Sequence, residues 1–180
     1  AATWPIAKKV HHNILVRTAP EKWTRANSYP PNPEHTRMFD LGMDWAHENE
    51  ARKRPVFIEN EGLKLAGEYF DFGHKRCAII FPGRTESLYY SYYFAPPYAE
   101  AGCNILVVDS RAHGLSEGKY NYCSTREWSD VIAWSRFAHD QLGCSDVVLR
   151  GICVGGAAVV LAAAQPDFPA DVSDLGGAGL

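Results

Sequence analysis

Three short loops each follow an apolar run and carry the residues whose types could do chemistry. They are residues 82–87 (PGRTES), 109–118 (DSRAHGLSEG) and 151–156 (GICVGG). In the third loop, Cys153 has a glycine two residues away on each side, the pattern G-x-C-x-G. An ionised thiol is a strong nucleophile, and a helix N-terminus favours the ionised form. The chemistry predicted by this loop is covalent attack on a carbonyl carbon.

The glycine spacing around Cys153 has a physical reason. A strand-to-helix turn that lifts a nucleophile out of a sheet is so tight that side chains two positions away would collide. The pattern alone is weak, because glycine-rich turns also bind phosphates or simply permit close packing. Its position between an apolar run at 146–149 and a small-residue segment ending at Ala164 strengthens the catalytic interpretation.

The apolar runs predict the framework that positions these loops. Residues 56–72, interrupted at Glu61-Gly62, predict a hairpin, and 77–81, 104–109 and 146–149 predict buried strands. Helix-like segments separate these strands, which indicates a parallel sheet with crossover helices. We therefore expect an α/β fold with the three loops together at the carboxyl ends of the strands, where such sheets place their sites.

Other local signals predict helix boundaries and a later strand. The aromatic segment 88–101 predicts a helix broken near Pro96-Pro97. Ser124 and Glu127 have capping-box spacing, which predicts a helix N-terminus there. Another strand is expected over 175–180.

The first 54 residues differ from the rest. They contain three of the five tryptophans and a turn-rich stretch before Pro33, where a helix is predicted to begin. We expect residues 1–54 to form an extension packed on the core, with no chemistry of its own. Residues 55–180 would then be the α/β domain.

Together the three loops resemble those of the α/β-hydrolase fold superfamily, of the lysophospholipase, monoglyceride-lipase and serine-aminopeptidase type. Residues 82–86 stand where that family has His-Gly-x-x-Glu, and residues 109–118 resemble D-x-x-G-H-G-x-S-x-G. Residues 151–156 stand where the family has G-x-S-x-G-G. The cysteine elbow is similar to that of dienelactone hydrolases and polyhydroxyalkanoate synthases, which the rest of the chain does not resemble. The resemblance covers about residues 56–180 and implies the N-terminal part of the fold.

The resemblance also implies roles for individual residues. Cys153 would be the nucleophile, and the backbone N–H groups of Val154 and Arg84 would form the oxyanion hole. His113 belongs to the second loop and is interpreted as structural. We also expect a substrate-binding contribution from the segment that begins at Gly83. Its aromatic residues Tyr89 and Tyr90 could line an acyl pocket, although such a stripe is more often core.

The sequence departs from the family pattern at the nucleophile, in the first loop and after the elbow. Cys153 stands in place of serine, which fits a native thiol nucleophile, a Ser-to-Cys replacement or a degenerate site. In the first loop, Pro82 stands in place of the histidine of His-Gly. In this fold the acid and the histidine follow the nucleophile, but all seven histidines precede Cys153. The later acids are Asp167, Asp171 and Asp174. We therefore expect the base to come from outside this chain, either a C-terminal part of the same protein or a second chain, and the sheet to be incomplete.

These observations favour a hydrolase or acyltransferase that acts on a small ester, thioester or amide. The alternatives are a non-catalytic binding protein of this fold and a carbon–carbon bond hydrolase. No metal or cofactor is implied, because the cysteines form no Cys/His cluster. The five cysteines are expected to be free thiols, which favours a cytoplasmic location, with secretion after signal removal left open. A net charge of −3 with scattered basic residues argues weakly against nucleic acid or an anionic membrane as the main partner, and no apolar run is long enough to span one.

Overall fold

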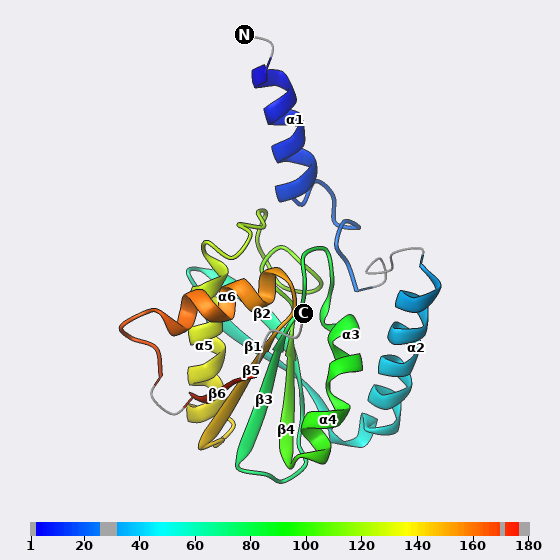
Figure 1. Ribbon diagram of the computed structural model, residues 1–180, viewed down its shortest axis with the longest axis vertical. Coiled ribbons are helices and arrows are strands. Elements are labelled where there is room, and N and C mark those ends of the chain that lie inside the picture. Colours follow the sequence, from blue (N-terminus) through cyan, green and yellow to red (C-terminus); the bar gives the residue numbers. More distant parts are fainter. Residues whose placement is uncertain (1–2, 26–31, 170–171, 177–180) are drawn as a thin grey trace.

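The computed structural model describes residues 3–25, 32–169 and 172–176. Within these residues, six strands form one sheet in the order β1-β2-β4-β3-β5-β6 (Figure 1). Strands β1 and β2 form an antiparallel hairpin, β2 also runs antiparallel to β4, and the remaining neighbours are parallel. The bounds are β1 (Lys53–Asn60), β2 (Leu63–Phe70), β3 (Arg76–Phe81), β4 (Cys103–Val108), β5 (Asp146–Gly151) and β6 (Val172–Gly176).

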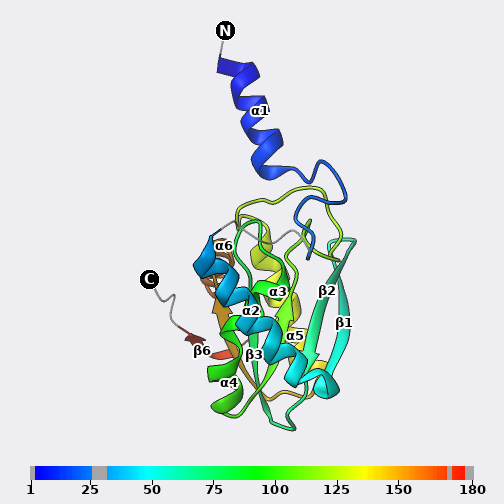
Figure 2. The ribbon, with the colours of Figure 1, turned by 90° about the vertical axis from the view of Figure 1, so that its right-hand side faces the viewer.

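Helices cover both faces of the sheet. The helix α5 and the following α6 lie on one face, and α2, α3 and α4 lie on the other (Figures 1 and 2). The first helix, α1, projects away from the body of the molecule. The bounds are α1 (Thr3–Leu15), α2 (Pro33–Glu48), η1 (Glu50–Arg52), α3 (Leu88–Ser91), η2 (Tyr92–Phe94), α4 (Pro96–Glu100), α5 (Glu127–Asp140) and α6 (Val154–Ala163).

The continuous apolar runs of the central strands follow from this two-sided covering. On β3, Cys77 and Ile79 pack in the core beneath α5 and α6, whereas Ala78 and Ile80 pack in the core beneath α2 to α4. Because alternate side chains of a strand point to opposite faces, a strand covered on both sides is apolar at nearly every position. The prediction of an α/β fold with a mostly parallel sheet and crossover helices is confirmed.

The capping box predicted at Ser124 and Glu127 is wrong. The N-cap of α5 is Arg126, without a side-chain cap. The Ser124 hydroxyl instead donates to the Val154 carbonyl at 2.6 Å, and Glu127 accepts from the Tyr122 N–H at 2.7 Å. A bond from Ser124 to the start of α6 and a bond to Glu127 from Tyr122, five residues earlier, therefore replace the pair that the spacing suggested.

Several boundary predictions can be compared with the structure. The segment 88–101 is interrupted as expected, into α3, η2 and α4, and α2 begins at Pro33 with the Asn32 side chain as its cap. The predicted strand at 175–180 begins earlier, as β6 at Val172, and residues 177–180 lie outside the described part. The domain division at residue 54 stays a prediction, and β1 begins at Lys53. All five cysteines are free, as expected.

Residues 16–25, which we call the strap, tie the N-terminal segment to the second loop and to the residues that directly follow it. Val16 forms a β-bridge with Tyr120, and the Arg17 N–H donates to the Lys119 carbonyl at 2.8 Å. Farther along, the Trp23 ring stacks on a side chain of that loop, His113, with 4.5 Å between ring centroids. The strap is thus fixed to residues roughly a hundred positions away in the sequence.

Candidate active site

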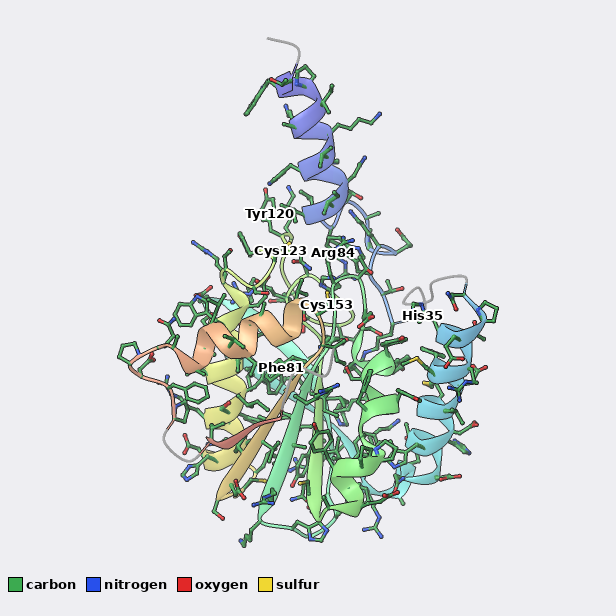
Figure 3. All side chains as sticks on the ribbon, in the orientation of Figure 1. His35, Phe81, Arg84, Tyr120, Cys123 and Cys153 are labelled. Carbon is green, nitrogen blue, oxygen red and sulfur yellow. The ribbon has the colours of Figure 1, made fainter. Side chains whose placement is uncertain are left out.

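Cys153 lies at the turn between β5 and α6, as predicted, and its backbone is strained. Its backbone angles, φ 52° and ψ −115°, lie outside the regions that residues other than glycine ordinarily adopt. Such strain persists only where the surroundings enforce it, and it gathers at functional sites. The side chain is exposed and stands at the N-cap of α6 (Figure 3). This is the arrangement of a nucleophile elbow.

The glycines around Cys153 are required by contact. A Cβ on Gly151 would lie 2.3 Å from the Gly156 Cα, because β5 and α6 meet there. A Cβ on Gly155 would lie 2.5 Å from the Phe81 carbonyl oxygen, at the end of β3. Both contacts are with backbone atoms, which cannot move aside as a side chain could. The tight turn expected from the glycine spacing is therefore present in the structure.

The first loop begins beside the elbow. Strands β3 and β5 are parallel neighbours with Phe81 opposite Gly151, so the loops that leave them start next to each other. Within this loop, the Glu86 carboxylate accepts from the Gly83 N–H at 2.8 Å, which closes a tight turn around the exposed Arg84. Figure 3 shows Arg84 and Cys153 at the same end of the sheet. Burial raises the pKa of Glu86.

The second loop is organised by the buried carboxylate of Asp109. This side chain accepts from the Leu88 N–H at 2.9 Å, from the Leu115 N–H at 3.0 Å and from Arg25 Nε at 3.0 Å. Burial raises the pKa of Asp109, and the Arg25 guanidinium opposes that shift. Asp109 thereby connects its own loop, the start of α3 and the strap.

His113 has the contacts of a structural residue. Its Nδ1 lies 2.9 Å from the Arg111 carbonyl oxygen, and its ring is stacked on Trp23. Burial lowers the pKa of His113 to about 4, so the ring is neutral at physiological pH. These contacts fit its interpretation from the sequence.

The two tyrosines proposed for substrate binding have different surroundings. Tyr90 is buried, and its hydroxyl donates to the sulfur of Met38 on α2 at 3.7 Å. Tyr89 is half-buried and stacks on Tyr92, with the Arg25 guanidinium 5.3 Å from its ring centroid. A role for either in substrate binding stays a prediction.

A small cavity lies behind the elbow. Its volume is about 20 Å³, which is room for one water molecule and not for an acyl substrate. Its lining includes Phe81, Ser124, Glu127 and Val154. The buried Oε2 of Glu127 has no hydrogen-bond partner in the described part of the chain.

Sequence reasoning did not anticipate Ser124 or the strap. Ser124 touches the elbow through the Val154 carbonyl, on the residue that follows the nucleophile, and its own φ is 77°. The strap supplies Arg25 and Trp23 to the loops around the site. The capping-box spacing was the only signal at Ser124, and it indicated a different partner.

The acids that follow Cys153 are only partly described. Asp167 is exposed and pairs with Arg136 at 3.0 Å. Asp171 lies outside the described residues, and Asp174 lies on β6. Among the described residues, no group of three or more His, Cys, Asp or Glu side chains could hold a metal ion. No helix in the described ranges is both long and apolar enough to cross a membrane.

The sequence of the chain was compared with models of known protein families, and the result agrees with the geometry of the elbow and its loops. The model of the α/β hydrolase fold family matches residues 79–174, more than half of the chain. The chain belongs to this family. No curated protein sequence matches the chain significantly.

Solved structures show the same fold. An esterase of Pyrococcus furiosus is 25% identical with a TM-score of 0.62, covering 68% of this chain and 50% of the esterase. An α/β hydrolase from Vibrio vulnificus is 16% identical with a TM-score of 0.62, covering 93% of this chain and 55% of that protein. Epoxide hydrolase A from Mycobacterium thermoresistibile is 23% identical with a TM-score of 0.53, covering 68% of this chain and 38% of that one. The chain spans about half the length of the first two structures.

Proposed function

We propose that this α/β hydrolase cleaves or transfers acyl groups of a small ester, thioester or amide through Cys153. The observation that carries the proposal is the backbone of Cys153, strained and exposed at the N-terminus of α6. A buried structural thiol would need neither strain nor exposure. The similarity to an esterase supports the same reaction class.

The oxyanion hole is proposed to use two backbone N–H groups, those of Val154 and Arg84. Val154 is the first residue of α6, whose leading N–H groups have no partner within the helix. Arg84 lies in the turn that Glu86 closes. Two donors aimed at a developing oxyanion stabilise it more than they stabilise the planar carbonyl, which lowers the barrier for acyl transfer.

The reaction would then proceed in two balanced steps. The thiolate of Cys153 attacks the carbonyl carbon, and the tetrahedral adduct expels the alcohol, thiol or amine, which takes up a proton and leaves a thioester on the sulfur. Water then attacks the thioester, releases the acid and returns the thiol. We propose that a histidine from outside these 180 residues moves both protons, since every histidine here precedes Cys153.

The first step can be tested without that histidine. The 180-residue chain is treated with p-nitrophenyl acetate, which should acetylate Cys153 and release p-nitrophenolate once per chain. Mass spectrometry of peptides locates the acetyl group. The matched control is Cys123, the other exposed cysteine, in the variants Cys153→Ala and Cys123→Ala. We expect the stoichiometric release of p-nitrophenolate to be lost in Cys153→Ala and kept in Cys123→Ala.

Two results would contradict this proposal. Equal acetylation of Cys123 and Cys153 would show ordinary thiol exposure instead of a built site, as in a non-catalytic member of the fold. Preferential acetylation of Cys144 would move the reactive thiol elsewhere. A hydrogen bond from Cys77 lowers the pKa of Cys144, but its side chain is fully buried, so we expect it to stay unmodified.

A further inference from the structure

The helix α1 presents an apolar surface that the described part of the protein leaves uncovered. It buries none of its residues, and its large apolar side chains are exposed, Trp4 by 73% and Ile6 by 66%. Val10 and Ile14 are exposed as well. Four of the large exposed hydrophobic residues therefore belong to one helix of 13 residues.

These side chains are arranged as in an amphipathic helix. Ile6, Val10 and Ile14 recur every four residues, so they follow one side of α1. Lys8 and Lys9, both exposed, lie outside this stripe, and the helix contains no acidic residue. It therefore joins an apolar stripe to a cationic one, in a chain whose overall charge is −3.

The projection of α1 is fixed at its base. The Lys22 ammonium donates to the Asn13 carbonyl at 2.7 Å and to the Val16 carbonyl at 2.5 Å, and so caps the end of the helix. The Asn121 N–H donates to the Leu15 carbonyl at 2.9 Å. These bonds join the helix end to the strap and to the segment that follows the second loop. Figures 1 and 2 show α1 extending from the end of the molecule where, in Figure 3, Cys153 lies.

The neighbouring loop extends the same surface. Leu115 and Tyr120 are exposed, and the Tyr120 ring lies 6.4 Å from that of His11 between centroids. Lys119, beside Tyr120, is exposed too. Apolar, aromatic and basic side chains thus continue from α1 onto the protein body.

We infer that α1 and the adjoining loop dock on an anionic membrane surface. Helices that lie in a membrane interface combine an apolar side carrying residues such as Trp and Leu with a polar side rich in Lys. The lysines would face anionic headgroups while Ile6, Val10 and Ile14 enter the acyl boundary. This partner fits the charge of α1 better than a second copy does, because two such cationic helices repel each other. The local excess of positive charge on α1 is not evident from the net charge of the whole chain or from the scattered distribution of its basic residues.

Vesicle co-sedimentation of the 180-residue chain tests the inference. Vesicles of phosphatidylcholine with 30% phosphatidylglycerol should bind the chain, and phosphatidylcholine alone should bind it far less. Removing both lysines in Lys8→Ala/Lys9→Ala should weaken partitioning roughly 25-fold at low salt. Ile6→Asp/Val10→Asp should weaken it by at least about tenfold, through loss of apolar burial together with repulsion between the new carboxylates and the anionic headgroups.

Matched variants on other surfaces separate this effect from general ones. Leu41 on α2 and Lys75 before β3 are exposed, so Leu41→Asp and Lys75→Ala should bind vesicles as the parent chain does. All variants should keep the parent melting temperature, because α1 buries nothing. Equal binding to both kinds of vesicle, or to neither, would overturn the inference. So would self-association that Ile6→Asp/Val10→Asp abolishes in the absence of vesicle binding, which would make a second copy the partner.

Discussion

Gly155→Ala should lower the free energy of unfolding and displace the elbow. The added Cβ would lie 2.5 Å from the Phe81 carbonyl oxygen and 2.6 Å from that of Pro82. Ordinary contact begins near 3.4 Å, so α6 and the end of β3 must separate by close to a further ångström. Overpacking of this kind costs about 1–3 kcal/mol.

Gly156→Ala is the matched control, one residue farther along the same helix. Its Cβ would meet only the Gly151 backbone, the oxygen at 3.3 Å and the carbon at 3.5 Å, so a small adjustment accommodates it. Alanine favours a helix over glycine by about 1 kcal/mol, and both variants share this gain. The difference between them therefore isolates the steric cost.

Thermal unfolding and acetylation by p-nitrophenyl acetate measure the two effects. Gly155→Ala should melt below Gly156→Ala by about 2–4 °C for each kcal/mol of difference. Cys153 should also be acetylated more slowly in Gly155→Ala, because the same shift displaces the start of the Arg84 loop. Equal melting temperatures and equal acetylation rates in the two variants would refute the argument that the elbow depends on this contact.

Three further predictions concern the surroundings of the site. Ser124→Ala should slow acetylation of Cys153 several-fold, whereas Ser135→Ala, which removes another buried hydroxyl bonded to a carbonyl, should leave the rate unchanged. Arg25→Ala should lower the free energy of unfolding by about 3 kcal/mol in denaturant titrations, because it removes the guanidinium that pairs with the buried carboxylates of Glu68 and Asp109 and leaves them only their weaker partners. Stability should fall by up to about 3 kcal/mol as pH drops from 6.5 to 4, since the unfolded chain protonates His113 while the folded chain resists; His113→Gln should flatten that dependence.

The sequence was sufficient for the parts of the fold that local patterns determine. Apolar runs identify β3, β4 and β5, because strands covered on both faces are apolar at nearly every position. The glycines around Cys153 identified the elbow, because only a tight turn requires them at that spacing. Both signals are contained within a few neighbouring residues.

The parts that the sequence did not predict depend on distant contacts. Ser124 bonds to Val154, thirty positions away, and Arg25 bonds to Asp109, farther still. No periodicity or spacing records such a pair, so the spacing at Ser124 predicts a local cap, and the residues of the strap suggest no chemistry. The roles of Cys153, Val154 and Arg84 stay predictions until the thiol chemistry is measured.

The strap has a consequence for the order in which the protein acquires its structure. It is synthesised before the sheet, yet its partners at Gly114 and Ser116 lie 97 and 99 positions from Arg17. Contacts so far apart in sequence carry a large loop-closure cost, so they form after the chain between them has collapsed. During synthesis on the ribosome, residues 16–25 must therefore remain unattached until the second loop emerges. A stalled chain ending before that loop should leave Trp23 solvent-exposed, and Trp23 fluorescence would report the moment of closure once the other tryptophans are replaced by phenylalanine.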